Sequence, residues 1–180
     1  MHPMTAALGT VLVSREDIQC RIAELGRQIS QDYAGKTITI VAVLKGSFVF
    51  LADLIRQFDP GIPVEVDFMA VSSYGDSTSS SGTVHIEKDL EVSIEGKDVI
   101  IVEDIVDSGL TLHNVHNILS GRGARSLRVA ALLEKPGNSR YKGALDYLGF
   151  QIQDQFVVGY GLDFAQKFRN LPDIRVLNEI

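Results

Sequence analysis

The sequence predicts an α/β protein with a mainly parallel sheet flanked by helices. Apolar, β-branched runs typical of buried strands, such as residues 37–44 and 127–133, alternate with segments of helical periodicity. This alternation of strand and helix is typical of parallel sheets. The 180 residues contain no internal repeat and no linker rich enough in glycine, proline or serine to separate two units, so we expect a single domain over residues 1–180.

The first third of the chain predicts two helices and two strands. Ser14 is a good N-cap for a helix that reaches about Asp32, because apolar side chains follow it at helical spacing, namely Ile18, Ile22, Leu25 and Ile29. Gly35 ends that segment, and the run 37–44 predicts a strand buried on both faces. Residues 48–57 predict a helix that returns over the sheet, and the alternating residues 64–72 predict the next strand.

The middle of the chain carries a long polar segment. Residues 77–82 are too small and polar to pack into a core, and short strands are expected beyond them at 83–86 and around Val92. The serines of this segment are compatible with a flexible linker. Because a long polar loop between two strands of a compact domain more often covers a ligand, we expect Ser73 to Gly82 to act as a lid.

The second half continues the same alternation. It predicts, in order, a core strand at 99–103, a helix at about 111–119, a buried strand at 127–133, a strand at 156–159 that closes the sheet, and a turn or short helix at 161–169. Gly121 and Gly123 end the helix.

Composition narrows the classes of function. The net charge of −6 argues against general nucleic-acid binding, which needs clustered cations. Cys20 is the only cysteine, so no internal disulfide can form. Residues 1–8 lack a basic start followed by a long apolar stretch, and no apolar run is long enough to span a membrane. We therefore expect a cytoplasmic protein without membrane contact.

The stretch V-I-I-V-E-D-I-V-D-S-G-L-T-L, residues 99–112, is the most informative of the chain. Glu103 and Asp104 follow an apolar strand, and Asp107 precedes a Ser-Gly turn and the start of a helix. A strand that ends at such a turn is typical of an anion-binding loop. A plain strand-to-helix connection capped by Thr111 is the alternative. Acids at an anion-binding loop repel the ligand unless they hold sugar hydroxyls, hold a metal or move a proton.

Polar residues follow each predicted strand. Ligands of parallel sheets bind beyond the carboxyl ends of the strands. The residues expected at that rim are Lys45, Gly46 and Ser47, then Ser73 and Tyr74, then 103–111, then Lys135, and then 156–163. Two lysines, several acids, hydroxyls and an aromatic ring would therefore converge on one site.

The block 99–112 resembles the phosphoribosyl-pyrophosphate (PRPP) motif of the type I phosphoribosyltransferases, most closely the hypoxanthine-guanine enzymes. The resemblance covers nearly the whole chain. It includes L-K-G-S at 44–47, whose Leu–Lys peptide can be cis in the family, S-S-Y-G at 72–75, L-L-E-K-P-G at 132–137, F-V-V-G-Y-G-L-D-F at 156–164 and F-R-N-L-P at 168–172.

The resemblance implies a role for each matching residue. Asp107 would be catalytic and exchange a proton with the purine N7. PRPP and pyrophosphate would be bound by Lys45, Gly46, Ser73, Tyr74, Glu103, Asp104, Ser108, Gly109, Leu110, Thr111 and Arg169. The purine would meet Lys135, Phe156, Val157 and Asp163, and Mg²⁺ would be held at Glu103, Asp104 and Asp163. Leu110 stands where some relatives have Lys, which leaves the phosphate to backbone and hydroxyl groups.

The resemblance also implies a reaction and an assembly. A base and PRPP would give a nucleoside 5′-monophosphate and pyrophosphate, with hypoxanthine or guanine as the base. The fold would be the type I phosphoribosyltransferase fold with a small hood from the chain ends, in a homodimer or homotetramer. The sequence leaves open the ranking of hypoxanthine, guanine and xanthine.

Other functions have weaker signals. A regulator that keeps this fold and binds nucleic acid would need a basic face or an added domain, and neither is visible in the sequence. A P-loop kinase would need a Gly-Lys-Thr/Ser sequence, which is absent. His113 and His116 lie three residues apart on one predicted helix but lack a third metal ligand, so we interpret them as surface residues.

Overall fold

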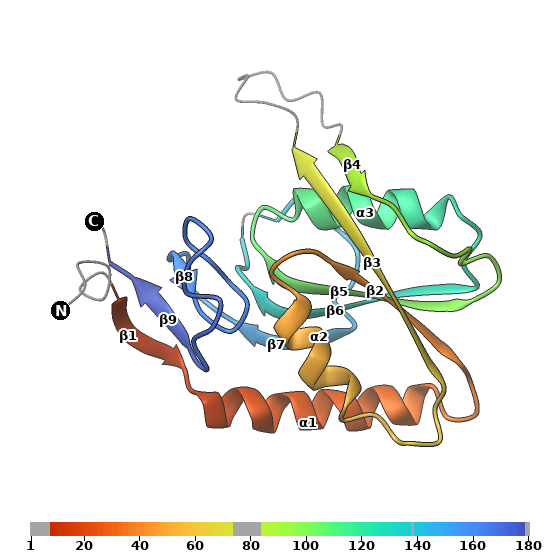
Figure 1. Ribbon diagram of the computed structural model, residues 1–180, viewed down its shortest axis with the longest axis horizontal. Helices are drawn as coiled ribbons and strands as arrows, with labels where there is room; N and C mark the ends of the chain where they lie inside the picture. Colours follow the sequence, from red (N-terminus) through yellow and green to blue (C-terminus); the bar gives the residue numbers. More distant parts are fainter. Residues whose placement is uncertain (1–7, 74–83, 138, 179–180) are drawn as a thin grey trace.

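The computed structural model describes residues 8–73, 84–137 and 139–178, and it confirms the α/β fold with a mostly parallel sheet (Figure 1). Its elements are β1 (Leu8–Val13), α1 (Arg15–Asp32), β2 (Ile38–Val43), α2 (Phe48–Ile55), β3 (Val64–Ser73), β4 (Val84–Lys88), β5 (Asp98–Val106), α3 (Leu110–Ser120), β6 (Ser126–Glu134), β7 (Tyr147–Gln151), β8 (Val157–Val158) and β9 (Ile174–Leu177). None of the helices in this described part is long and apolar enough to cross a membrane.

Six strands form the main sheet, in the order β4-β3-β2-β5-β6-β7. β3, β2, β5, β6 and β7 run parallel, and only β4 pairs antiparallel, with β3. β2 lies at the centre and all its residues are buried, as its continuous β-branched sequence predicts. The parallel strands all end at one edge, which is where a ligand site is expected.

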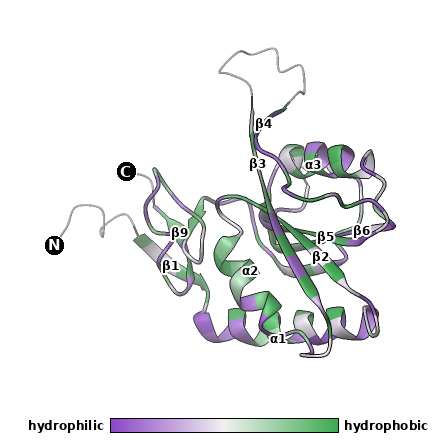
Figure 2. Ribbon diagram, turned by 45° about the vertical axis from the view of Figure 1, so that its right-hand side comes forward, coloured by the Kyte–Doolittle hydropathy of each residue, from purple (hydrophilic) through white to green (hydrophobic). Residues whose placement is uncertain are grey.

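Two hydrophobic cores lie on opposite faces of the main sheet. Alternate residues of β2 divide between them, with Ile40 in the core under α1 and α2 and Val41 in the core under α3. Figure 1 shows the same layers, with α1 and α2 on one side of the strands and α3 on the other. Figure 2 shows hydrophobic residues running along the central strands. The sheet is therefore covered on both faces.

The helix starts follow local chemistry. The Ser14 hydroxyl oxygen accepts a hydrogen bond from the Asp17 amide at 3.1 Å, so the predicted N-cap of α1 is confirmed. α3 instead begins after Gly109, whose φ of 68° is left-handed. The alternative that Thr111 caps this helix is therefore wrong.

The ends of the chain form a second, small sheet of three antiparallel strands, in the order β1-β9-β8. The prediction that residues 156–159 close the main sheet is wrong, because β8 belongs to this small sheet and β7 is the edge of the main one. β1, β7 and β9 were not expected from the sequence. The small sheet lies beside the carboxyl ends of the parallel strands (Figure 1), where the expected hood would lie.

Some smaller expectations change. The residues around Val92 form bends rather than a strand. The Asp67 carboxylate accepts hydrogen bonds from the backbone amides of Glu91 and Val92, at 2.7 and 3.3 Å, and so engages the groups that a strand would pair. Residues 161–169 form turns with isolated bridges instead of a helix. The core strand is longer than predicted and continues through Glu103 to Val106. Nearly all of the expected lid lies outside the described residues.

Candidate active site

A cavity of about 370 Å³ lies beyond the carboxyl ends of β2 and β5. Three segments line most of it, namely residues 43–46 after β2, residues 103–112 from the end of β5 into α3, and Asp163 with Arg169 from the connection between β8 and β9. The small sheet therefore supplies one wall, and the main sheet supplies the floor and the other wall.

The loop before α3 lines the cavity with groups that could bind an anion. Ser108, Leu110 and Thr111 line the cavity, and the first amides of α3 lie among them. Free amides at a helix start attract anions. A Cβ on Gly109 would lie 2.2 Å from the Ser139 Oγ, so glycine is required there by space as well as by its positive φ. The Arg140 amide fastens the loop by donating to the Ser108 carbonyl at 2.7 Å.

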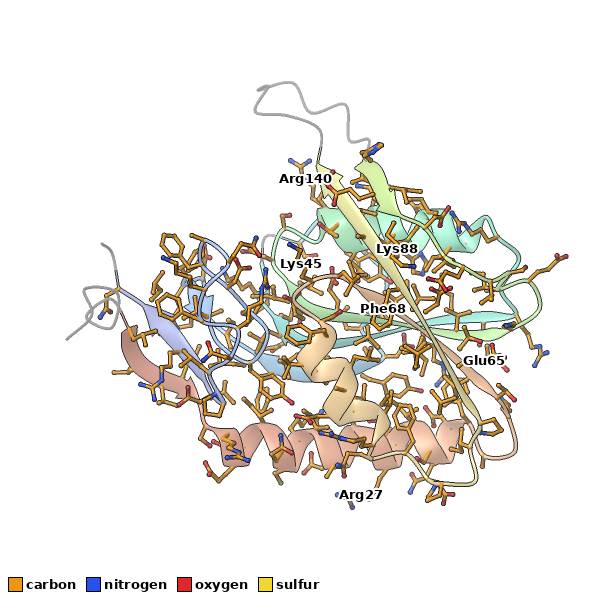
Figure 3. All side chains as sticks on the ribbon, in the orientation of Figure 1. Arg27, Lys45, Glu65, Phe68, Lys88 and Arg140 are labelled. Carbon is orange, nitrogen blue, oxygen red and sulfur yellow. The ribbon has the colours of Figure 1, made fainter. Side chains whose placement is uncertain are left out.

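The loop after β2 lies in close contact with the end of β5 and with the connection between β8 and β9. The Leu44–Lys45 peptide is cis. A Cβ on Gly46 would lie 1.6 Å from the Asp104 Oδ2, and a Cβ on Gly161 would lie 2.3 Å from the Gly46 carbonyl oxygen. Lys45 is exposed at the end of the main sheet that faces the small sheet (Figure 3). The loop thus places the exposed Lys45 at the cavity while Gly46 lies against the Asp104 carboxylate.

A buried acid, Glu103, and a partly buried one, Asp104, form the floor of the cavity. Burial raises the pKa of Glu103 well above its usual value, and the adjacent Asp104 charge raises it further. Burial raises the pKa of Asp104 to about 6, although the Ile105 amide donates to its carboxylate at 2.8 Å and Arg169 favours its charge. Ionised acids in this position are under-compensated, so a cation or several hydroxyl donors would stabilise them.

Arg169 and Asp163 form an ion pair at the wall supplied by the small sheet. An Arg169 nitrogen lies 2.8 Å from the Asp163 carboxylate, and both side chains are largely buried. Arg169 also donates to the Gly161 carbonyl at 2.7 Å, and the Gln166 amide donates to Asp163 at 2.7 Å. The connection between β8 and β9 is therefore fixed by its own polar groups.

A second cavity of about 220 Å³ adjoins the first. Lys135, Phe156, Val157 and Leu162 line it, together with residues that line both cavities, namely Asp104, Ile105, Asp107 and Asp163. Phe156 is half exposed and meets the ring of Phe164 edge to face at 5.8 Å between centroids. A flat apolar molecule in this cavity would lie against Phe156 and reach the first cavity past Asp107.

Lys135 lies at the boundary of these cavities with two carboxylate partners. Its Nζ is 2.8 Å from the Asp107 Oδ2 and 3.3 Å from the Asp154 Oδ1, and its side chain is only 10% exposed. Burial lowers the pKa of the ammonium, but the hydrogen bonds to both carboxylates outweigh burial and raise it above its usual value. Lys135 is therefore a fixed, positively charged donor.

No group of three or more His, Cys, Asp or Glu residues able to hold a metal ion occurs in the described part of the chain. His113 and His116 contact side chains of their own helix, at 3.0 Å to Asn117 and 3.3 Å to Ser120. The described side chains alone therefore form no complete set of metal ligands. The acidic floor fits an ion that receives its remaining ligands from a phosphate substrate.

The structure brings most of the predicted site residues together. The first cavity contains Lys45, Gly46, Glu103, Asp104, Asp107, Ser108, Gly109, Leu110, Thr111, Asp163 and Arg169, and the second contains Lys135, Phe156 and Val157. Ser73 ends β3, and Tyr74 lies outside the described residues. Asp154 also lies at this site, next to Lys135, and no sequence motif pointed to it. Recognition of 147–151 as a strand would have placed it at the same rim.

Comparison with known proteins agrees with this geometry. A model of the phosphoribosyl transferase domain matches residues 14–165. The hypoxanthine-guanine phosphoribosyltransferase of Bacillus subtilis (strain 168) is 48% identical over 167 residues, which cover 93% of this chain and 92% of that protein. The hypoxanthine phosphoribosyltransferase of Salmonella typhimurium is 49% identical over 164 residues, 90% of this chain and 91% of that protein.

Solved structures match equally well. The crystal structure of a hypoxanthine phosphoribosyltransferase from Staphylococcus aureus in a tetragonal space group has a TM-score of 0.91 and 46% sequence identity, and it covers 97% of this chain and 94% of that one. Family model, sequence relatives and structure agree over nearly the whole length. The chain therefore belongs to the phosphoribosyl transferase domain family.

Proposed function

We propose that this phosphoribosyltransferase transfers the 5-phosphoribosyl group of PRPP to N9 of hypoxanthine or guanine. The products are IMP or GMP and pyrophosphate, as in purine salvage. The two adjoining cavities support this assignment, since one is polar and framed by anion-binding loops and the other is narrow and bordered by an aromatic ring. Such a pair suits a sugar polyphosphate beside a planar base.

The observation that carries the proposal is the Lys135–Asp107 pair. The Lys135 Nζ and an Asp107 carboxylate oxygen lie 2.8 Å apart in the wall of the second cavity. O6 and N7 are neighbours on one edge of a 6-oxopurine, close enough for a single side chain to contact both. An ammonium offers only donors and therefore suits O6, while a carboxylate suits the N7 hydrogen. The pair thus complements that edge of the base.

The reaction follows from this placement. The N9 lone pair forms a bond to C1′, and the bond from C1′ to the pyrophosphate oxygen breaks, with its electron pair leaving on pyrophosphate. The proton on N7 passes to Asp107, which acts as a general base. Positive charge develops on the sugar in such transfers, and the nearby carboxylates of Glu103 and Asp104 stabilise it.

The first cavity would hold PRPP by its two ends. The 5′-phosphate would lie at the start of α3, bound by amides and by the hydroxyls of Ser108 and Thr111. Pyrophosphate would lie between the loop that contains Lys45 and Gly46 and the Arg169 side chain. Glu103 and Asp104 would accept hydrogen bonds from the ribose hydroxyls. These donors offset the repulsion expected between an acidic protein and an anionic substrate.

Mg²⁺ fits the same acidic floor. When bound, it neutralises the charge of the leaving pyrophosphate. Glu103 and Asp104 would hold one ion, directly or through the ribose hydroxyls, and Asp163 is the candidate ligand for another. Two neighbouring carboxylates beside the site proposed for a polyphosphate match the preference of Mg²⁺ for few protein ligands and several substrate oxygens.

Further parts of the proposal concern specificity, assembly, location and the contacts of two more residues. Carbonyls near Val157 and Asp163 would accept hydrogen bonds from the guanine 2-amino group, so guanine should be a substrate. We also propose a homodimer or homotetramer, which sedimentation would test, and a cytoplasmic location. The contacts of Ser73 and Tyr74 with PRPP stay predictions.

The test is pyrophosphate release from PRPP with hypoxanthine, guanine, xanthine and adenine in turn. The 6-amino group of adenine would face the Lys135 ammonium, so two hydrogen-bond donors would meet without an acceptor. Such a buried mismatch lowers binding by ~1–3 kcal/mol or more. Sites of this kind can discriminate by ~10⁴-fold. We expect strong preference for 6-oxopurines, and Lys135→Ala should weaken that preference mainly by loss of hypoxanthine turnover. Efficient adenine turnover by the native protein would overturn the assignment, and absence of all turnover would favour a regulator that only binds PRPP.

A further inference from the structure

Asp154 is the carboxylate near the proposed active site that the reaction does not use. It lies shortly after β7, its side chain is 73% exposed, and its Oδ1 is 3.3 Å from the Lys135 Nζ. Lys135 itself is largely buried, so this contact joins a residue at the surface to a donor inside the base cavity. The ammonium therefore has one partner that faces the base and one that faces solvent.

The two partners have different fates during the proposed reaction. Asp107 becomes a neutral acid when it takes the N7 proton, and it then no longer compensates the Lys135 charge. A buried ammonium without a negative partner is destabilised by desolvation. At that stage O6 of the base also needs its donor, because negative charge is drawn toward it as the N7 proton leaves.

We propose that Asp154 is a positioning residue that keeps Lys135 charged and directed at O6 of the base after Asp107 has accepted the proton. The inference rests on the proposed function. It assigns Asp154 no contact with substrate, and its whole effect passes through the Lys135 ammonium.

The other charged groups around Lys135 are otherwise engaged. Asp104 and Asp163 line the same cavity, but Asp163 pairs with Arg169 and Asp104 lies on the acidic floor assigned to ribose and Mg²⁺. The adjacent Glu134 carboxylate accepts a hydrogen bond from Gln151 at 2.9 Å. Asp154 is thus the partner in direct contact that remains when Asp107 is neutral.

The kinetic test compares Asp154→Asn, Asp154→Glu and Glu134→Gln at neutral pH. Exposed ion pairs are worth about 2- to 5-fold in an equilibrium. We expect Asp154→Asn to lower kcat/KM for hypoxanthine by about that factor, with KM for PRPP unchanged and with Asp154→Glu closer to native. Glu134→Gln removes the same charge one residue away from Lys135 and should behave as native.

A second readout is the pKa of Lys135, followed by NMR of ¹³C-labelled lysine and assigned with Lys135→Arg. Asp154→Asn should lower that pKa, and Glu134→Gln should not. An unchanged Lys135 pKa and unchanged hypoxanthine kinetics in Asp154→Asn would overturn the inference even if the native protein is fully active. A native protein without transferase activity would instead remove the proposed function, so the two failures are distinct.

Discussion

Asp107 lies in the wall shared by both cavities, where its carboxylate can meet a base on one side and a sugar on the other. Its one strong partner is Lys135, and half of its side chain remains exposed. This placement suits the proposed role of Asp107, in which it exchanges a proton while Lys135 holds the base. At the residue scale, the chemistry of the site therefore depends on which carboxylates are paired and which are not.

Asp107→Asn should separate proton transfer from binding. The amide keeps the size of the side chain and can still accept a hydrogen bond from Lys135, but it cannot accept the N7 proton. General acid–base groups are worth ~10²–10⁴-fold in rate. We expect kcat to fall by about that factor and the Kd for PRPP, measured by calorimetry, to stay near native. Near-normal turnover would remove Asp107 from the role of base.

Asp104→Asn should stabilise the unliganded protein at neutral pH. The pKa of Asp104 is about 6 in the folded protein against 3.8 ordinarily, so the folded state binds this proton more tightly than the unfolded chain does. The group's favourable contribution to stability is complete below pH 3.8 and is lost as the pH rises through about 6. We expect the free energy of unfolding of the variant, measured with urea at pH 7.5, to exceed that of the native protein by on the order of 3 kcal/mol. This difference should vanish near pH 4. PRPP should bind more weakly.

Asp89→Asn is the matched control for that experiment. Its pairing with Arg122 lowers the pKa of Asp89, so the sign reverses and the native carboxylate stabilises the fold above its ordinary pKa. Because Asp89 is half exposed, we expect a loss below about 1 kcal/mol at pH 7.5. If both variants shift stability in the same direction, burial is not the cause of the Asp104 effect.

At the scale of elements, three connections build the site, namely β2 to α2, β5 to α3 and β8 to β9. Each brings backbone into close contact with its neighbour at a glycine. The tightest approach is Gly46, whose hydrogen faces the Asp104 carboxylate. The loop after β2 and the end of β5 are therefore coupled in position although their sequences are far apart.

Gly46→Ala should test that coupling. The new methyl group would overlap the Asp104 carboxylate, so either the loop or the acid must move. Displacements of about 1 Å near reacting groups can lower rates by ~10²-fold. We expect kcat/KM for PRPP to fall by about 10- to 100-fold. Gly121→Ala, where a methyl group would meet nothing closer than 3.5 Å, should leave kinetics unchanged.

The sequence predicted the buried helices and strands well and the partly exposed strands poorly. β2, β5 and β6 have continuous apolar runs, and α1 has a clear periodicity and cap, so their sequences identify them. β1, β7 and β9 are short and largely half exposed, and the partner of β1 is β9, which lies at the other end of the chain. No local pattern specifies such strands.

The sequence likewise predicted the parts of the site that lie within one segment but not the contacts between distant segments. Motif spacing predicted the segments 44–47 and 103–111 as parts of the site, because the residues of each segment lie close together in the sequence. The contact of Lys135 with Asp107 depends on β5 and β6 being neighbours, with Val106 opposite Glu134. The contact with Asp154 additionally needs β7 beside β6. Long-range register, which the sequence does not display, decides those two contacts.

At the scale of the whole molecule, one continuous core joins the small sheet to the main sheet. Ile174 of β9 is fully buried in the same cluster as α1 and the central strands, while Val11 of β1 is 44% exposed. The wall that carries Arg169 is therefore anchored by packing beneath it.

Ile174→Ala should weaken the molecule as a whole. Truncation of a fully buried isoleucine costs ~2–5 kcal/mol, and we expect that loss in urea unfolding together with a raised KM for PRPP. Val11→Ala in the same small sheet should change stability by no more than about 0.5 kcal/mol. A loss of stability with unchanged kinetics in Ile174→Ala would show that the wall keeps its place without this packing.

β9 pairs with both β1 and β8, yet it follows every other strand in the chain. During synthesis on a ribosome, β1 is made first and must wait without its partner until residue 177 has emerged. The connection that carries Arg169 and Asp163 has its own polar contacts, but it joins the small sheet only when β9 pairs with β8 and β1. A nascent chain can therefore form its parallel sheet before the small sheet is complete. We expect PRPP to bind to chains in which β9 has been synthesised and not to chains that still lack it.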